Sequence, residues 1–260
     1  HYLSKLLKVK EYVDGHLNLG IALQEHGKLD AAISSYRNAL RLKPGFDLAY
    51  YNLGNALRDL GKPGEAVECY RKAIKNNNKL FLAHNNLGLS LQELGNLEEA
   101  IVFQRQTVEL APEFSEGYFN LHALLLDTTN MMPSIGCLER AVEIQPTNVK
   151  YRFTLGMLWD YSGDTQRAET HFSFIENGPN ADKYWLDAWH YLKANEAKIP
   201  PIVGTSIETF KLGLEASISG GLVLEFGVRF GTSIRQITTL VEEEIHGFDS
   251  FEGLPDPWAG

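Results

Sequence analysis

The stretch HLNLGIALQEHGKLDAAISSYRNAL, residues 16–40, recurs as YYNLGNALRDLGKPGEAVECYRKAI at residues 50–74 and as HNNLGLSLQELGNLEEAIVFQRQTV at residues 84–108. The offset is 34 residues each time. Aligned on the shared glycine column, the repeats run over 13–46, 47–80 and 81–114, and looser copies follow at 115–148 and 149–182. Two apolar, helix-periodic segments in each copy predict stacked pairs of antiparallel helices, a mainly α fold.

Three recurring columns of these repeats have a packing role. The first helix of each copy carries an inward-facing leucine, at Leu19, Leu53, Leu87, Leu121 and Leu155. The next position is small and lets two helices approach closely; it holds Gly20, Gly54, Gly88 and Gly156, with His122 in the fourth copy. The second helix carries a small residue for the same reason, at Ala32, Ala66, Ala100 and Ala168, with Ser134 in the fourth copy.

Glycine and proline columns predict where the helices end. A glycine that closes the first helix in a left-handed conformation is expected at Gly27, Gly61, Gly95 and Gly163. Prolines that terminate the second helix are expected at Pro44, Pro112 and Pro146, with Asn78 in this place once.

These columns together resemble the tetratricopeptide repeat (TPR) family, and the resemblance implies an α-solenoid with five repeats over 13–182. Residues 1–12 fit the second half of a further, partial repeat, with Tyr2 in the column of Tyr36 and Tyr70. The chain is therefore expected to begin within a repeat.

An asparagine recurs on the outward face of the first helices, at Asn18, Asn52, Asn86 and Asn120, and Thr154 ends the series. Because a side-chain amide both donates and accepts hydrogen bonds, such a row suits the backbone of an extended peptide of any sequence. It resembles the asparagine ladder of repeat arrays that hold proteins for glycosyl transfer. The alternative is that these amides bond neighbouring helices. A protein or extended peptide in the concave groove is the partner that this row predicts.

The neighbouring groove columns contain no lysine: one holds Leu17, Tyr51, Asn85 and Phe119, and the other holds Ile21, Asn55, Leu89 and Ala123. TPR proteins that clamp a terminal carboxylate use lysine and arginine in such columns, so that mode of binding is not expected here. The mixed apolar and amide character favours a partly hydrophobic ligand.

Composition excludes several other classes of protein. The net charge of -9 argues against a nucleic-acid partner, and neither a bilayer-spanning run nor a signal peptide is present in these residues. Two cysteines, Cys69 and Cys137, are too few for a disulfide scaffold. The histidines show no metal-ligand spacing. A cytoplasmic protein without a metal site, and with no membrane or nucleic-acid partner, is expected.

The 34-residue pattern stops after residue 182. Residues 183–200 predict a helix that caps the solenoid, with Trp185 and Trp189 on one face, followed by a linker. Pro200 and Pro201 mark a boundary, and residues 201–260 predict a second domain. Within it SGGLVLEFGV and IHGFDSF are expected to be parallel strands that flank a helix, a βαβ unit.

The segment between these strands, EFGVRFGTS at 225–233, together with GFDSFEGLPDPW at 247–258, resembles S-adenosylmethionine-dependent methyltransferases of the macrocin O-methyltransferase type. The resemblance implies a Rossmann-like α/β unit that binds S-adenosylmethionine. The cofactor-binding residues it implies are Glu225, Phe226, Gly227, Gly231, Thr232, Ser233, Asp249 and Ser250. Alternatively, Glu225 is a turn or capping carboxylate and Asp249 an ordinary strand-end residue.

Residues 201–260 are too short for a complete methyltransferase sheet, because two strands and a helix cannot bury both sheet faces. The chain is therefore expected to be inactive, with no catalytic residue assigned and weak or absent cofactor binding. Two functions remain open. One is the peptide-binding part of a methyltransferase, and the other is a non-enzymatic TPR scaffold. A glycosyltransferase is disfavoured by the GFDSFEGLP segment.

Overall fold

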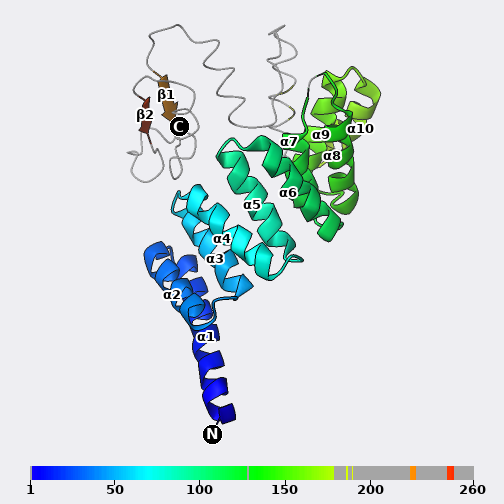
Figure 1. The fold of residues 1–260 in the computed structure, drawn as a ribbon. Coiled ribbons are helices and arrows are strands. Elements are labelled where there is room, and N and C mark those ends of the chain that lie inside the picture. The colour runs from blue at the N-terminus through cyan, green and yellow to red at the C-terminus, as the bar shows by residue number, and fades with distance from the viewer. Residues whose placement is uncertain are drawn as a thin grey trace. The chain divides into compact units, whose positions relative to one another are not determined.

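The computed structural model describes residues 2–127, 129–178, Leu186, Trp189, 223–226 and 245–248, and the side chains from Tyr12 onward in the helical part. The described chain contains ten helices and two strands (Figure 1). The helices are α1 (Tyr2–Glu25), α2 (Leu29–Leu42), α3 (Asp47–Asp59), α4 (Pro63–Asn76), α5 (Phe81–Glu93), α6 (Leu97–Leu110), α7 (Ser115–Leu124), α8 (Met132–Ile144), α9 (Val149–Tyr161) and α10 (Thr165–Glu176). The strands are β1 (Val223–Phe226) and β2 (Ile245–Phe248).

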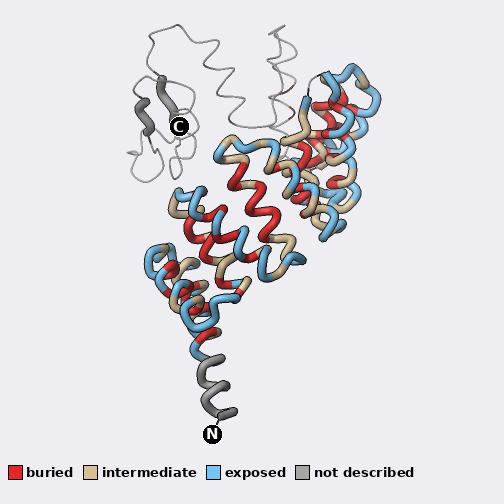
Figure 2. The backbone as a smooth tube through the Cα atoms, in the orientation of Figure 1, coloured by how far each residue is buried: buried red, intermediate tan, exposed pale blue. Residues whose placement is uncertain are grey.

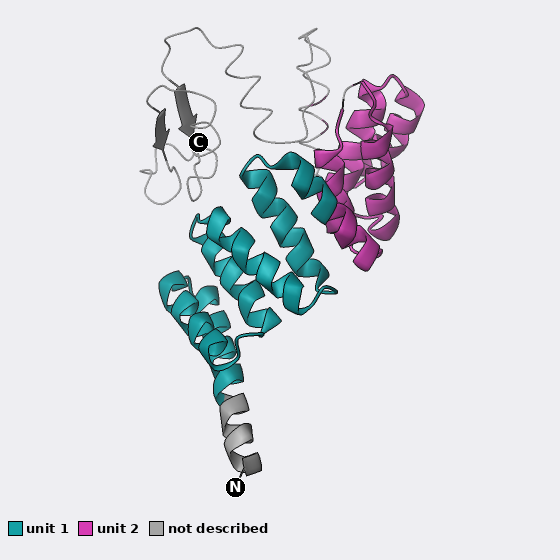
Figure 3. Ribbon diagram, in the orientation of Figure 1, with its two compact units in different colours: residues 1–103, 209–260 teal, residues 104–208 magenta. Residues whose placement is uncertain are grey.

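In four repeats the two helices pack on each other as the sequence predicts, α1 on α2, α3 on α4, α7 on α8 and α9 on α10. Buried residues lie along these helices (Figure 2). The chain divides into two compact units, His1–Phe103 with Thr209–Gly260 and Gln104–Glu208 (Figure 3). In the first unit α1 packs on α2, α2 on α3, α3 on α4 and α4 on α5, and α3 also contacts α1 and α5. In the second unit α7 packs on α8, α8 on α9 and α9 on α10.

The predicted helix ends are confirmed in four repeats. The four column glycines have φ between 72° and 92°. At Gly27 the N–H bonds the Gln24 carbonyl at 2.9 Å, and the Lys28 N–H bonds the Leu23 carbonyl at 2.8 Å. This pair of hydrogen bonds is the Schellman motif, in which carbonyls of the last helical turn accept N–H groups that follow the helix. At the proline column, α2, α6 and α8 each end two residues before Pro44, Pro112 and Pro146.

Three glycines of the first-helix column, Gly20, Gly54 and Gly156, face an aromatic ring rather than the alanine of the second helix. A Cβ on Gly54 would lie 2.6 Å from Tyr70 Cε1, and one on Gly156 would lie 2.6 Å from Phe172 Cε1. Gly20 meets Tyr36 in the same way. Because real Cβ atoms do not approach a ring so closely, the glycine makes room for the aromatic side chain 16 residues later. The alanine column is buried as predicted.

Two expectations about the amino-terminal repeat are wrong. Residues 2–12 do not form a separate second helix of an earlier repeat, because α1 is continuous from Tyr2 to Glu25. No proline interrupts α1, and its two interior glycines, Gly15 and Gly20, cost only about 1 kcal/mol each. Leu19 does not face inward either: it is 50% exposed, whereas the other four leucines of its column are buried. The described helices that pack on α1 are α2 and α3, and they leave this side of α1 uncovered.

The fourth repeat, which has Thr129 where the others have the closing glycine, ends its first helix early. α7 has 10 residues, against 13 in α3, α5 and α9. An Asp127 turn replaces the glycine: its carboxylate accepts the Thr129 N–H at 2.8 Å and the Thr129 hydroxyl at 2.7 Å. The Ser134 hydroxyl donates to the His122 carbonyl at 3.0 Å, near the shortened helix end. The same carbonyl accepts the Leu125 N–H at 3.1 Å, so the serine in the alanine column adds a second hydrogen bond at this helix end.

The core of the second unit continues past α10. Leu186 and Trp189 are helical, 2% and 4% exposed, and belong to the same buried cluster as Leu158 and Phe172. The Trp189 indole N–H donates to the Asp160 carboxylate at 2.8 Å. Leu186 and Trp189 thus extend this core beyond α10, whereas Trp185 lies outside the described part of the chain and the capping helix at 183–200 stays a prediction.

β1 and β2 pair in parallel, with Val223 opposite Ile245 and Phe226 opposite Phe248. The prediction of two neighbouring parallel strands is therefore confirmed for these eight residues. The remaining predicted cofactor-binding residues, namely Gly227, Gly231, Thr232, Ser233, Asp249 and Ser250, lie outside the described residues. The domain boundaries at residues 182, 200 and 201 remain predictions.

Candidate interaction face

The first helices of the first unit, α1 from residue 13, α3 and α5, share a side that carries the asparagine row; we call it the first-helix face. The three helices lie next to one another, because α3 contacts both α1 and α5. The row itself belongs to three successive helices at the same register, because 34 residues separate each asparagine from the next. Asn120 belongs to α7 of the second unit, where it is half-buried.

The three asparagines of the first-helix face are not equivalent. Asn18 is exposed and Asn52 half-buried, but Asn86 is only 8% exposed. The Asn52 amide donates to the Leu48 carbonyl of its own helix at 2.9 Å. An amide has two donor hydrogens and two acceptor lone pairs, so one such bond leaves capacity for a ligand.

Asn86 instead links α5 to α3. Its Nδ2 donates to Asn55 Oδ1 at 2.8 Å and to the Tyr51 hydroxyl at 3.4 Å, and its Oδ1 accepts from Asn85 Nδ2 at 3.0 Å. Asn55 Oδ1 also accepts the Tyr70 hydroxyl at 2.8 Å. Both donor hydrogens of Asn86 are thus in use inside the protein. For this residue the structure favours the helix-bridging alternative over peptide binding.

A second polar connection joins α1 to α3. The Tyr36 hydroxyl donates to Gln24 Oε1 at 3.0 Å, and Gln24 Nε2 donates to the Asp59 carboxylate at 2.8 Å. Burial raises the pKa of Tyr36 to about 12, with further contributions from the negative charges of Glu25 and Asp59. Both carboxylates therefore lie close enough to act on the same hydroxyl. Burial likewise raises the pKa of Tyr70.

Sequence reasoning missed these two connections, although a signal for them exists. The tyrosine column places a hydroxyl at the first-helix face, and Gln24 and Asn55 lie where an amide can accept it. This column holds a tyrosine at Tyr36 and Tyr70 but a phenylalanine at Phe172. Only the repeats with tyrosine need a hydrogen-bond partner for the ring hydroxyl.

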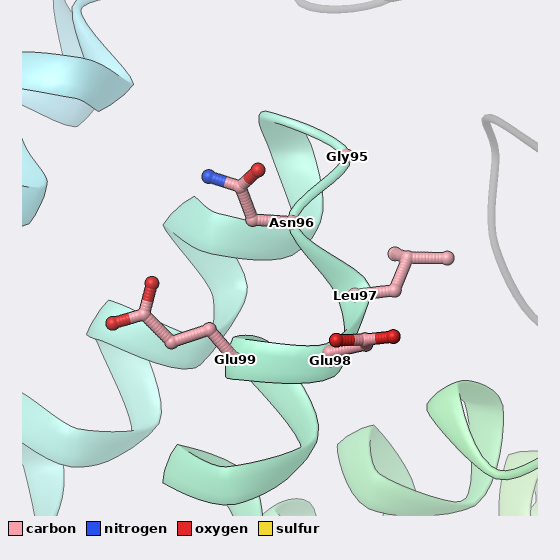
Figure 4. A pocket seen from close by; sticks show the side chains of 5 residues that line it. All are labelled: Gly95, Asn96, Leu97, Glu98 and Glu99. Carbon is pink, nitrogen blue, oxygen red and sulfur yellow. The ribbon is translucent and has the colours of Figure 1, made fainter.

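Two hollows of the described chain are lined by residues outside the asparagine row. One of about 540 Å³ adjoins Gly95 and the start of α6, where Asn96 and Glu99 point to one side and Leu97 and Glu98 to the other (Figure 4). Glu99 already pairs with Arg71 at 2.7 Å. Another of about 650 Å³ lies in the second unit beside Phe174, Ser173 and Thr147. Among the described residues no group of three or more His, Cys, Asp and Glu side chains is placed to hold a metal ion.

His84 and the two cysteines lie in surroundings that do not suit them for catalysis. His84 Nε2 lies 3.1 Å from the Asn78 carbonyl, within hydrogen-bonding distance. Cys69 is buried, which raises the pKa of its thiol to about 11. Cys137 is partly buried, and both cysteines are free. A thiol whose pKa is raised stays protonated at neutral pH and is a poor nucleophile.

Comparison with known proteins agrees with this geometry. The tetratricopeptide repeat family model matches residues 17–79 and 51–113. The matched span, residues 17–113, covers the first three repeats. The TPR array resembles solved structures at low sequence identity, among them PilF of Pseudomonas aeruginosa, at 20% identity and a TM-score of 0.60, over 74% of this chain and 95% of that one.

Two further TPR structures have a similar fold. YrrB, a TPR protein with an unusual peptide-binding site, is 21% identical with a TM-score of 0.56, over 73% of this chain and 97% of its own. MamA from Desulfovibrio magneticus RS-1 is 21% identical with a TM-score of 0.56, over 72% and 98%. At this identity the likeness shows the TPR fold. No curated protein matches the chain. No helix among the described residues is long and apolar enough to span a bilayer.

Proposed function

We propose that the TPR array is a protein-interaction module that holds an extended peptide segment of a partner on the first-helix face. The observation that carries this proposal is the surface position of Asn18 and Asn52 at the same register of adjacent helices. Next to Asn52, Leu48 is 42% exposed and Tyr51 is half-buried. An extended chain offers alternating backbone polar groups for the amides and side chains for the apolar positions.

This proposal needs no chemistry from the repeats, so the scaffold function that the sequence left as an alternative is the one preferred. The described array has no metal cluster. His122, the histidine whose pKa burial lowers most, has no hydrogen-bond partner for either ring nitrogen. Such a side chain is placed for packing rather than for proton transfer to a bound molecule.

The test uses peptides selected from a phage-displayed library of random dodecamers against the whole chain. Binding of the best peptide is measured by isothermal titration calorimetry for the wild type, Asn52→Ala and Asn76→Ala. Asn76 is a matched control, because its amide donates to the Lys72 carbonyl at 2.7 Å just as Asn52 donates to Leu48, but on the second helix α4. We expect Asn52→Ala to weaken binding roughly tenfold, the loss of one or two hydrogen bonds. Equal affinity for all three proteins would refute the proposal.

A second candidate function is that residues 201–260 begin an S-adenosylmethionine-dependent methyltransferase domain that the repeats supply with an acceptor. The parallel pairing of β1 and β2 favours it, because both strands then end at one edge, where Gly227 and Asp249 follow. By the family resemblance, Glu225, Thr232 and Ser233 would bond the cofactor's polar groups and Asp249 its ribose.

The encoding gene downstream of Gly260 provides the direct test of this second candidate. Further alternating strands and helices there, followed by calorimetric binding of S-adenosylmethionine to the longer protein, would support the methyltransferase. Loss of that binding in Asp249→Ala, with Asp256→Ala as control, would assign the ribose contact. A longer protein that folds and does not bind the cofactor would exclude it.

A further inference from the structure

Charge is unevenly distributed between the two helix layers of the first unit. Residues 13–25 of α1, with α3 and α5, carry five carboxylates and one cation. The carboxylates are Asp14, Glu25, Asp47, Asp59 and Glu93, and the cation is Arg58. The second helices of this unit, α2, α4 and α6 up to Phe103, show no such excess, with five cations and five carboxylates.

Three of these carboxylates repeat with the asparagine row. Glu25, Asp59 and Glu93 each lie seven residues after an asparagine of the row. Seven residues are about two helical turns, so asparagine and carboxylate lie on the same face, roughly 10 Å apart along the helix axis. A row of amides and a row of carboxylates therefore run side by side across α1, α3 and α5.

The carboxylate row is positioned at the surface. Glu25 is exposed, and Asp59 and Glu93 are partly exposed. The bond from Gln24 Nε2 holds one oxygen of Asp59 at the junction of α1 and α3. Among the described residues, no lysine or arginine forms an ion pair with Glu25, Asp59 or Asp14, whereas Glu68 and Glu99 on the second helices both pair with Arg71.

We infer that the occupant of the first-helix face is an extended peptide segment rich in lysine or arginine, whose backbone meets Asn18 and Asn52 while its cationic side chains reach the carboxylate row. This inference rests on the proposed function and adds the chemistry of the partner. Two residues of extended chain advance about 6.6 Å, and side chains of one parity point to one side. Alternate basic residues thus place a row of charges along one edge of the peptide. The flexible stems of lysine and arginine supply the remaining reach.

The experiment uses three fluorescein-labelled dodecapeptides, (Ala-Lys-Val-Lys)3, (Ala-Gln-Val-Gln)3 and (Ala-Glu-Val-Glu)3, with the whole chain, measured by fluorescence anisotropy at low and physiological salt. The face variant is Glu25→Gln, Asp59→Asn and Glu93→Gln combined. Its control, Asp30→Asn, Glu65→Gln and Glu68→Gln combined, removes the same charge from the second helices. Arg58→Gln has the opposite effect, because it removes a positive charge from the first helices. Circular dichroism verifies that every variant is folded.

The lysine peptide is expected to bind more tightly than the glutamine peptide, and the glutamate peptide most weakly. The face variant should bind the lysine peptide roughly tenfold more weakly than wild type, with a shallower salt dependence, and the control should match wild type. Arg58→Gln should bind it more tightly. Equal loss in the face and control variants would overturn the inference, because attraction would then follow net charge alone.

The outcomes separate this inference from the proposed function. If the glutamine or glutamate peptide binds as tightly as the lysine peptide, and binding still falls in Asn52→Ala, the face binds peptides but the basic preference is wrong. If no peptide responds to Asn52→Ala or to the face variant, both proposals fail.

Discussion

The repeat at 47–80 places Gly54 against the ring of Tyr70, whereas the repeat at 115–148 has His122 and Leu138 at the corresponding positions. In the first case the missing Cβ makes room for a buried ring whose hydroxyl bonds Asn55. In the second the smaller Leu138, 0% exposed, leaves room for the imidazole of His122, which is 7% exposed and lies edge-on to Phe119 at 4.5 Å. Glycine and an aromatic residue thus occur together in three repeats, whereas the third repeat combines Gly88 with Gln104.

The comparison also shows what the fourth repeat loses. In place of a tyrosine hydroxyl with a partner, it buries an imidazole without one. Around it Phe119 stacks on Tyr151 at 4.9 Å, and the Lys150 ammonium lies 4.3 Å from the centre of the Phe119 ring. The fourth repeat therefore depends on aromatic contacts and on one neutral histidine, and the second on hydrogen bonds across repeats.

The largest expected effect comes from Gly54→His. The imidazole would have to occupy the space of the Tyr70 ring, and overpacking together with the lost Tyr70–Asn55 bond should lower the free energy of unfolding by about 3 kcal/mol or more. Tyr70→Leu in the same protein should recover part of this loss, because the pair then copies His122 and Leu138. Urea unfolding followed by circular dichroism gives the double-mutant cycle, with an expected coupling above about 1 kcal/mol.

Gly64→Ala is the control for this cycle. Gly64 is a helical glycine of α4 with nothing within 4 Å of an added Cβ, so the substitution should leave stability unchanged or raise it by up to about 1 kcal/mol. Strictly additive effects of Gly54→His and Tyr70→Leu would show that the two positions do not form a packing pair.

Acidification should affect the fourth repeat through His122. Burial, aided by the positive charge of Lys150, lowers the pKa of His122 to about 3 in the folded protein, from an ordinary value near 6.5. Between these values the unfolded chain binds a proton that the folded chain does not, so the stability present above pH 6.5 is lost as the pH falls. At pH 5 the loss relative to pH 7 is roughly 2 kcal/mol.

The measurement is urea unfolding at pH 7, 6 and 5 for the wild type and His122→Gln. The glutamine variant should be less dependent on pH by the amount that His122 contributes. His171, whose pKa burial also lowers, is present in both proteins and cancels in the difference. Parallel pH profiles for the two proteins would mean that His122 has the same pKa in the folded and the unfolded chain.

Loss of the inter-repeat hydrogen bonds should have a comparable effect in the first unit. Asn86→Ala removes the donor to Asn55 and Tyr51 and the acceptor of Asn85, and we expect a loss of about 2 kcal/mol. Asn52→Ala, which removes a single bond within one helix, should cost less than about 0.5 kcal/mol. Thermal unfolding monitored by circular dichroism checks both. A loss for Asn52→Ala as large as that for Asn86→Ala would contradict the assignment of different roles within one sequence row.

The sequence predicts the array well because each helix pair depends on nearby residues. The period, the left-handed glycines, the proline stops and the buried alanines all follow from one repeat and its neighbour, and the structure agrees with them. The prediction fails where residues at the same position of different repeats are assumed to have the same surroundings. Leu19 shares the leucine column but lacks a covering helix, and Asn86 shares the asparagine row but lies buried in a network that needs Tyr51, Asn55 and Tyr70 together.

The candidate site is therefore only half predictable from sequence. The asparagine row identifies a face, but whether an amide is free for a ligand depends on the residues that neighbouring helices place beside it, as Asn52 and Asn86 show. The carboxyl-terminal strands are a different case. Their parallel pairing follows from two short apolar runs separated by a helical pattern. Cofactor binding by Glu225 and Asp249 stays a prediction, because it depends on turns that the sequence pattern alone does not place.

The smallest effect that separates the two repeats concerns the end of the first helix. Gly61 has a φ of 75°, and its Lys62 neighbour bonds the Leu57 carbonyl at 2.8 Å, so Gly61→Ala should cost about 1 kcal/mol through left-handed strain. In the fourth repeat the Asp127 carboxylate makes the turn by accepting two bonds from Thr129. Thr129→Gly should therefore bring no gain, and should lower stability slightly by removing one of those bonds. Urea unfolding of both variants checks the pair. A stabilised Thr129→Gly would show that the fourth repeat is an imperfect copy of the glycine ending rather than a different one.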